Sequence, residues 1–411
     1  MADPTLFAQI KDPSNRADPY PLYARLRGHP VTRQDDGSYL VSSHAAIRAL
    51  LFDPRISSAD LPPAHSPPTG NPLKDWILRP IKDEIVSRHR PLIFRDPPDH
   101  DSLRNIVMTQ FTPERVHGMK ARTESLVGEL LDKCRGRDEI CVVDDLAYPL
   151  PVTIICEMLG VPREDEPRFQ GWATQLATAL EPDARHDEET QAENRRTFDT
   201  ISDYMKGLIK EKRRKPQDDM LSGLAAKTKA GAMGDFDLIA TSILLLVAGH
   251  ETTVNLITNG MLTLLRHPDE MERLKHDPER APRLIEELLR FEPPVHFRTR
   301  KALADIPISG QVIPKDAAVV LLFAAANRDA DRFPDPDRFD PDRPDNQHFG
   351  FGGSLHYCLG APLARIEGDV ALVTLARRLV NPRLIDDPPP YRDGASLRGP
   401  KSLRLRIDGI A

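Results

Sequence analysis

The sequence FGFGGSLHYCLGAPLAR, residues 349–365, contains a cysteine, Cys358, between a glycine-rich run and an apolar segment. The glycines permit a tight backbone bulge before the cysteine. The apolar segment has Pro362 near its first turn and keeps helical spacing to Val380, which predicts a helix. Cys358 is therefore expected at a helix amino terminus, where unpaired N–H groups and the helix dipole favour thiolate over thiol.

A thiolate at this position suits a metal ligand. Taken alone, a single cysteine is more often a small buried hydrophobe, so that alternative stays open. Zinc would need about three further ligands, but His356 is the only close histidine, and haem needs a single axial sulfur from the protein. Cys134, Cys141 and Cys156 have no CxxC spacing, which argues against both a disulfide framework and a zinc ribbon.

A second pattern spans Asp235–Arg266, which has an acidic start, apolar residues on nearly every face and a proline soon after its end. These features predict one long, buried helix. Its middle reads AGHETT, a polar island whose groups must be satisfied. In a purely structural interpretation, the Thr252 hydroxyl bonds back to the carbonyl of Ala248, and Glu251 pairs with a base elsewhere.

The chemical interpretation of AGHETT is a small-residue notch at Ala248 and Gly249 with groups that pass protons beside it. Ala248 and Thr252 lie one helical turn apart and share a face, whereas Glu251 is rotated by about 100°. The Thr252 hydroxyl would then face a ligand, with the Glu251 carboxylate behind it.

The rest of the sequence predicts a mainly α-helical protein with a minor β region. Apolar residues recur at helical spacing from Pro113 to Lys212, and Thr32–Ser43 is typical of a β-hairpin. We expect residues 1–411 to form a single domain. The net charge of −6 disfavours a general nucleic-acid binder, and Met1–Arg27 lacks a signal-peptide core, which favours a reducing cytoplasm without a membrane anchor.

Two motifs of the sequence resemble one protein family specifically. FGGSLHYCLG and AGHETT closely resemble the haem loop and oxygen-binding helix of cytochromes P450, and the resemblance runs from about Asp12 to the carboxyl end. Glu287 and Arg290 look like the family's Glu-x-x-Arg pair, and Arg338 like the third member of that triad. The resemblance implies a single-domain triangular fold with haem between the Asp235–Arg266 helix and the helix that follows Cys358.

The resemblance also implies the contacts of haem b, which is iron protoporphyrin IX. Cys358 would be the axial ligand of the iron. Basic residues suit the two propionates, although each could instead be a surface residue. The implied propionate anchors are His100, Arg104, Arg300 and His356. Further haem contacts are implied for Ala248, Gly249 and Phe351.

One position departs from the family pattern. Four residues before Cys358, where the family usually has glycine, stands Ser354. If the backbone there needs a glycine-like conformation, serine costs about 1 kcal/mol of strain. The ligand itself is unaffected.

The resemblance implies a monooxygenase that inserts one atom of O₂ into a small organic substrate, with proton transfer by Glu251 and Thr252. No flavin or dinucleotide region is visible, so a fused reductase is not expected; a ferredoxin and a NAD(P)H-dependent reductase would supply electrons, docking near Arg365 on the Cys358 side. We expect a monomer. A peroxide-driven peroxygenase and a haem-based ligand sensor without turnover are the alternatives.

Substrate identity does not follow from the sequence. The family analogy assigns specificity to Ile56–Phe94, Phe169–Tyr204, Ile243–Thr252 and Val295–Phe297. The first region is basic, which weakly favours an acidic substrate, although a solvated loop face explains the charges as well. Its basic residues are Lys74, Arg79, Lys82, Arg88 and Arg90.

Overall fold

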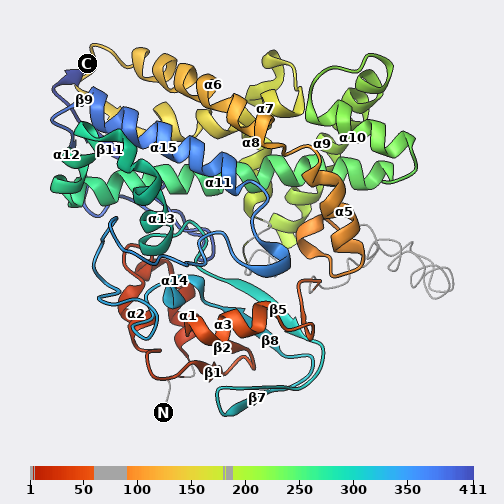
Figure 1. Cartoon of the computed structure of the whole chain (residues 1–411), viewed down its shortest axis with the longest axis vertical. Helices are drawn as coiled ribbons and strands as arrows, with labels where there is room; N and C mark the ends of the chain where they lie inside the picture. Colours follow the sequence, from red (N-terminus) through yellow and green to blue (C-terminus); the bar gives the residue numbers. More distant parts are fainter. Residues whose placement is uncertain (1–2, 4, 60–89, 179–180, 182–187) are drawn as a thin grey trace.

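The structure is a computed structural model that describes residues 3, 5–59, 90–178, 181 and 188–411. A large helical part lies above a smaller β-rich part in Figure 1. The longer helices are α5 (Asp99–Met108), α6 (Pro113–Asp132), α7 (Pro149–Leu159), α8 (Glu166–Ala177), α9 (Glu188–Arg214), α10 (Met220–Lys229), α11 (Asp235–Arg266), α12 (Pro268–His276), α13 (Ala281–Phe291) and α15 (Ala361–Arg378). Short helices are α1 (Leu6–Lys11), α2 (Tyr20–Ala24), α3 (His44–Leu51) and α14 (Phe323–Ala326). The mainly α-helical class is confirmed.

The central helix α11 has the predicted bounds and runs through the helical part, packed against α7, α8 and α15. Its length and composition would allow it to cross a membrane, but 67% of its most apolar window is buried inside the protein. A Cβ atom at Gly260 would lie 2.7 Å from a Leu372 methyl group, so glycine allows α15 to approach α11 closely. This approach brings together the two helices that the sequence predicts on either side of a cofactor.

The helix after the cysteine ends earlier than predicted. α15 stops at Arg378, and the backbone of Leu379 turns extended at ψ 124°. Val380, predicted as the helix end, instead lies in the strand β9 (Leu379–Val380), which pairs with β12 (Gly409–Ile410). A contact with a distant part of the chain therefore overrides the local helical periodicity.

The β-rich part is built on a five-stranded sheet in the order β1-β2-β8-β5-β3. Its strands are β1 (Val31–Arg33), β2 (Tyr39–Val41), β8 (Ala318–Leu321), β5 (Arg298–Ala302) and β3 (Ile56–Ser57). β1 and β2 form the predicted antiparallel hairpin, whereas β2 and β8 are parallel with Tyr39 opposite Val319. The sheet thus fixes β5, which carries Arg300, between two strands.

The remaining strands form small sheets. β10 (Arg383–Leu384), β11 (Arg404–Arg406) and β4 (Glu139–Cys141) form one of them, and β6 (Ile306–Ile308) pairs with β7 (Gln311–Ile313). The strands β4 and β11 are far apart in the sequence but are antiparallel neighbours in this sheet.

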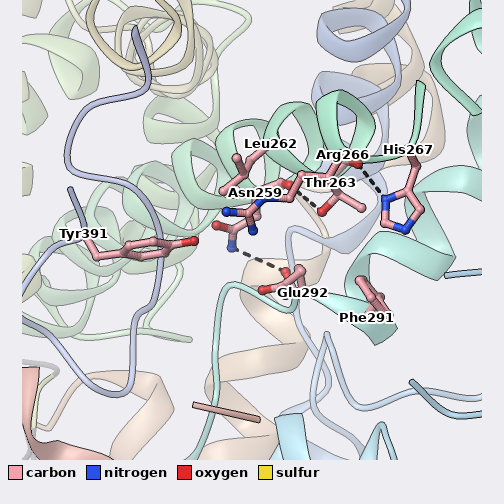
Figure 2. Close-up of a pocket in the computed structure, with 8 residues that line it drawn as sticks. All are labelled: Asn259, Leu262, Thr263, Arg266, His267, Phe291, Glu292 and Tyr391. Atoms are coloured by element: carbon pink, nitrogen blue, oxygen red, sulfur yellow. Dashed lines mark hydrogen bonds between the residues drawn. The ribbon is translucent and has the colours of Figure 1, made fainter. Parts of the chain in front are cut away.

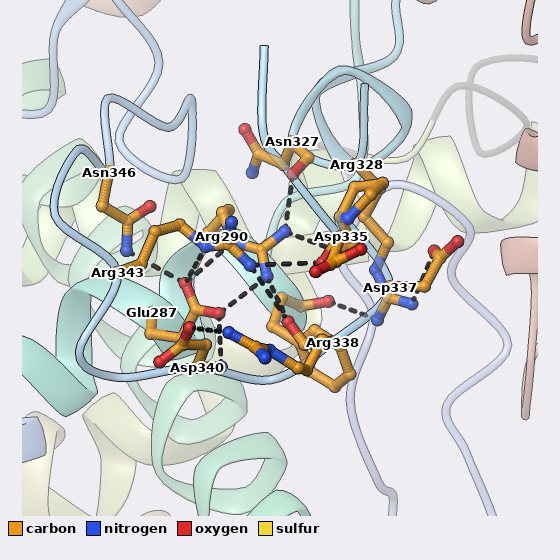
Figure 3. Close-up of polar contacts among 12 residues, drawn as sticks. Glu287, Arg290, Asn327, Arg328, Asp335, Asp337, Arg338, Asp340, Arg343 and Asn346 are labelled. Atoms are coloured by element: carbon orange, nitrogen blue, oxygen red, sulfur yellow. Dashed lines mark hydrogen bonds and ion pairs between the residues drawn. The ribbon is translucent and has the colours of Figure 1, made fainter. Parts of the chain in front are cut away.

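A buried ion pair links α13 to the segment before the cysteine loop (Figure 3). Glu287 and Arg290 are fully buried and share two hydrogen bonds of 2.7 and 2.8 Å. Arg290 also donates to the backbone carbonyls of Asn327, Pro336 and Arg338. The predicted Glu-x-x-Arg pair is therefore present and connects α13 to the chain between residues 327 and 338.

The prediction for the Arg338 side chain is wrong. That side chain is 65% exposed and pairs with Asp340, and only its backbone carbonyl joins the cluster. The third member of the buried group is instead Arg343, which is 5% exposed with its Nε 3.6 Å from Glu287 (Figure 3). Only four residues of irregular chain separate Arg338 from Arg343, so neither periodicity nor spacing distinguishes the two arginines in the sequence.

We predict that Arg290→Ala destabilises the protein by about 3–5 kcal/mol, because it leaves the Glu287 carboxylate buried without its main partner. Arg338→Ala is the matched control, and loss of its exposed pair with Asp340 should leave the free energy of unfolding nearly unchanged. Equilibrium unfolding in urea measures both. Similar free energies of unfolding for the two variants would contradict the burial argument.

Candidate active site

A cavity of about 270 Å³ lies between α11, β5 and the loop that contains Cys358. Thr252 lines it, and Glu251 does not, as the helical geometry predicts. Every residue predicted to contact a cofactor also lines the cavity: His100, Arg104, Ala248, Gly249, Arg300, Phe351, His356 and Cys358. Side chains up to about 260 positions apart in sequence therefore meet in one space.

The cysteine loop is held by its own backbone. The Cys358 N–H donates to the Phe351 carbonyl at 3.0 Å, and the Gly352 N–H donates to the Phe349 carbonyl at 2.8 Å. Gly352 has φ +70°, the left-handed conformation that glycine tolerates best. These bonds close the predicted bulge and aim the loop at the cavity.

The Cys358 thiol lies just before α15, as predicted, but its electrostatics differ from the expectation. Burial raises the pKa of Cys358, and the backbone N–H groups of Gly360 and Ala361, with the charge of Arg104, lower it by less. The helix terminus thus acts in the predicted direction and is outweighed by burial. A cation at the sulfur is needed to hold the thiolate form.

Basic side chains gather at one end of the cavity. The rings of His100 and His356 are 4.3 Å apart, and burial, followed by nearby Arg300, lowers the pKa of His356 to about 3. Burial and the charge of Arg298 lower the pKa of Arg300 to about 10. Burial, with repulsion between these cations as the smaller cause, disfavours their charged forms and makes this end of the cavity a site for anions.

Among the described residues, the hydrogen bonds of this basic cluster are to one carboxylate, that of Asp101 at 2.8 Å from Nδ1 of His100, and otherwise to backbone carbonyls. Arg104 donates to the Tyr357 carbonyl at 2.7 Å and Arg300 to the Thr299 carbonyl at 3.0 Å. The Nε2 atom of His100 is buried and has no hydrogen-bond partner within the described part of the chain. Two carboxylates of a bound group would satisfy these donors, so the cluster fits the propionates of a haem whose iron meets Cys358.

The middle of α11 contains both contacts of the structural interpretation. The Thr252 hydroxyl donates to the Ala248 carbonyl at 2.7 Å, and Oε2 of Glu251 lies 3.5 Å from Nε of Arg392. Burial raises the pKa of Glu251, and Arg392 opposes that rise. Since Thr252 also lines the cavity, these contacts position both groups beside it and leave the chemical interpretation intact.

Three groups near the site, two of them fully buried or nearly so, were given no role by the sequence analysis. His250 is fully buried against the Tyr148 ring, at 4.5 Å between centroids, and burial lowers its pKa to about 3. Glu367 lines the cavity from α15, and burial raises its pKa to about 8. Arg392, the partner of Glu251, comes from the carboxyl-terminal loop. His250 belongs to the polar island AGHETT, and Glu367 falls on the apolar face of its helix with Leu363 and Val370. Arg392 left no sequence signal.

The wall of the cavity away from Cys358 is mostly apolar. Three of the four predicted specificity regions contribute to the lining of this cavity: Ile243–Thr252, Val295–Phe297, and Ile56–Phe94 through Ser58 and residues 92–94. Between Phe169 and Tyr204, the described residues do not line the cavity. Arg90 is described and bonds the Ala59 carbonyl, whereas the other basic residues predicted in that region, Lys74, Arg79, Lys82 and Arg88, lie outside the described residues.

One thiol, an anion site and an acid–alcohol pair around a largely apolar cavity define the class of haem-thiolate oxygenases. Comparison with known proteins gives the same class. The family model "Cytochrome P450" matches residues 72–405. The chain is 37% identical over 397 residues to cytochrome P450 107B1 of Saccharopolyspora erythraea, which covers 95% of each chain. It is 33% identical to 6-deoxyerythronolide B hydroxylase of the same organism, over 98% of this chain and 100% of that protein.

A solved structure agrees over the whole length. Ligand-free CYP164A2 of Mycobacterium smegmatis is 39% identical, covers 98% of this chain and 100% of its own, and superposes with a TM-score of 0.87. The chain belongs to the cytochrome P450 family. It is thus an oxidoreductase of the bacterial monooxygenase group, whose members carry a haem-thiolate cofactor and use redox partners and small-molecule substrates.

Ser354 has the glycine-like backbone that the sequence departure suggested, with φ 55°. A non-glycine residue in this region costs about 1–2 kcal/mol. We predict that Ser354→Gly stabilises the protein by about 1 kcal/mol, because it removes this strain without changing the ligand. Thermal unfolding of the two haem-loaded proteins measures the gain, and an unchanged or lower melting temperature would show that serine is accommodated without strain.

Proposed function

We propose that the protein is a monooxygenase that inserts one atom of O₂ into a small organic substrate, by C–H hydroxylation or a related oxidation. The observation that carries the proposal is the single cavity shared by Cys358, the basic cluster and Thr252. We further propose that the active chain is one domain over residues 1–411, monomeric, cytoplasmic, and not associated with membranes or nucleic acids.

The cofactor in this proposal is haem b. Its iron would be held by the sulfur of Cys358 and its carboxylates by His100, Arg104, Arg300 and His356. Ala248, Gly249 and Phe351 would contact its ring. When bound, haem supplies the binding and reductive activation of O₂. The chain's own residues orient the substrate, limit water and control protons.

Thr252 and Glu251 have distinct proposed roles in proton control. The Thr252 hydroxyl donates its hydrogen bond to the Ala248 carbonyl. Its oxygen lone pairs therefore remain available to accept a hydrogen bond from a protonated oxygen in the cavity. Glu251 stands behind this hydroxyl with a pKa raised by burial. A raised pKa brings a carboxylic acid nearer to the working pH, where it can both hold and release a proton.

Electrons would come from a ferredoxin-type iron–sulfur protein and a NAD(P)H-dependent ferredoxin reductase. The proposed docking face includes Arg104, Tyr357 and Arg365 near the Cys358 loop. Arg365 is engaged by Glu286 through bonds of 2.6 and 3.0 Å, so its charge is partly neutralised. Salt-dependent reduction by an acidic ferredoxin would support this part of the proposal.

Two alternatives remain within the same fold. A peroxide-driven peroxygenase would make product from hydrogen peroxide faster than from NADH with ferredoxin and reductase. A haem-based sensor would bind ligands without substrate-dependent NADH consumption. The acid and hydroxyl of α11 favour the monooxygenase, because a peroxide-driven reaction has less need of protons delivered to oxygen.

We predict that Cys358→Ala abolishes the thiolate-type spectrum of the reduced, CO-bound protein, since the cavity offers no second cysteine. Cys134→Ala, Cys141→Ala and Cys156→Ala are the controls and should keep that spectrum. Survival of the thiolate spectrum in Cys358→Ala, together with its loss in a control, would reject Cys358 as the ligand.

We predict that Thr252→Ala keeps substrate binding and first reduction but diverts most NADH into hydrogen peroxide, because the proton-accepting hydroxyl is gone. Glu251→Gln should slow the proton-dependent steps by about 10²-fold or more, since an amide relays protons poorly. Product formed per NADH and peroxide released measure both effects. A Thr252→Ala enzyme that converts nearly every NADH into oxygenated product would reduce this hydroxyl to a structural group.

A further inference from the structure

Polar side chains continue along α11 beyond Glu251, on the face turned away from the cavity. Asn255, Asn259 and Thr263 follow Glu251 at intervals of four residues and are all buried. Residues four apart lie above one another on a helix, so these side chains form one line about 18 Å long. We call Glu251, Asn255, Asn259 and Thr263 the polar ridge.

The inner half of the polar ridge is joined by Arg392. Its guanidinium donates to Oδ1 of Asn255 at 2.5 Å and lies 3.5 Å from Oε2 of Glu251. The Arg392 side chain is 21% exposed, whereas the Glu251 side chain is 6% exposed. A Cβ atom at Gly399 would lie 2.1 Å from Oδ1 of Asn255, so a glycine leaves the room that this oxygen occupies.

The outer half of the polar ridge reaches a second, small cavity of about 30 Å³, large enough for an ordered water molecule (Figure 2). Asn259 and Thr263 line it, together with Tyr391 and Glu292. The exposed residue Arg266 also lines it, so this cavity lies next to solvent. It therefore supplies an entry point for water at the end of the ridge.

Hydrogen bonding along the ridge is incomplete. The Asn259 amide donates to the Arg398 carbonyl at 3.1 Å, and the Thr263 hydroxyl donates to the Asn259 carbonyl at 2.7 Å. The Nδ2 atom of Asn255 is buried and has no hydrogen-bond partner among the residues described. A buried amide donor of this kind is usually satisfied by water.

We propose that protons reach Glu251 along the polar ridge, entering at the small cavity and passing Asn259, Asn255 and Arg392. Each transfer takes a proton from solvent through ordered water to the Glu251 carboxylate, which has given its own proton to oxygen in the active-site cavity. Arg392 keeps its charge throughout and positions the carboxylate. This inference rests on the proposed proton role of Glu251.

The competing explanation is purely structural, because the same side chains anchor the loop that contains Arg392 and Arg398. Asn259→Ala and Asn259→Leu separate the two explanations. Both variants lose the bonds that Asn259 donates to the backbone, but alanine leaves space for water, whereas leucine fills it with hydrocarbon. Thr258→Val is the control off the ridge, since that buried hydroxyl bonds back to the Val254 carbonyl within α11.

The measurement is the rate at which the Glu251 carboxyl exchanges its proton for deuterium in the resting protein, followed by difference infrared spectroscopy. The Glu251 band is the one absent from Glu251→Gln. We expect Asn259→Leu to slow exchange by about tenfold or more, as a barrier increase of about 1.4 kcal/mol would. Asn259→Ala and Thr258→Val should stay near the wild-type rate. Equal rates in the leucine and alanine variants would overturn the proposal.

Arg392 provides a second test that does not alter the packing of α11. The groups that face Glu251 are Arg392 from the carboxyl-terminal loop and Tyr148 before α7, with His250 beside it on α11. Arg392→Met removes the only cation of this set, so the pH at which the Glu251 band titrates should rise by about one unit or more. Arg392→Lys should restore it in part. An unchanged midpoint in Arg392→Met would overturn the positioning role.

The two proposals can fail separately. If Glu251→Gln retains normal product per NADH, the proposed proton role of Glu251 is rejected, whatever the exchange rates are. If Glu251→Gln is impaired but Asn259→Leu exchanges as fast as wild type, the role of Glu251 stands and the polar ridge is rejected as its path.

Discussion

The buried pair of Glu287 and Arg290 is the interaction on which the cysteine site depends. Two charges without water must satisfy each other and every remaining donor, and here Arg290 does so by binding three backbone carbonyls between Asn327 and Arg338. The Asn327 side chain in turn accepts the Phe349 N–H at 2.7 Å. This chain of hydrogen bonds, from Arg290 through Asn327 to Phe349, connects the salt bridge on α13 to the loop that contains the Cys358 sulfur.

The same absence of water governs the chemistry of the cavity. Burial disfavours charge on Cys358, Glu251 and Glu367 and on the imidazoles of His250 and His356, so the apoprotein site prefers neutral groups. Its arginines remain charged. A cofactor that brings a cation to the sulfur and carboxylates to the basic end would neutralise both ends at once, so binding the group and organising the site are one electrostatic event.

Sequence reasoning succeeded where a local pattern determines the outcome. The apolar run and its acidic start located α11 to the residue, and the glycine bulge located the cysteine loop. It failed where a contact involves an irregular segment. Arg343 rather than Arg338 contacts Glu287, and Arg392 contacts Glu251. Both arginines lie in loops whose sequences have no helical or strand periodicity to predict from. The prediction that the helix extends to Val380 was wrong for the same reason, because Val380 pairs with the strand β12 near the end of the chain.

The parallel pairing of β2 with β8 has a consequence for how the protein is made. Tyr39 in β2 pairs with Val319 in β8, which is synthesised 280 residues later. At about 5–20 residues per second, that interval lasts roughly fifteen seconds to one minute on the ribosome. During this time the hairpin has an unpaired edge, and such an edge is a template for association with other chains. The topology of this fold therefore leaves the amino-terminal hairpin open to association with other chains until β8 has been made.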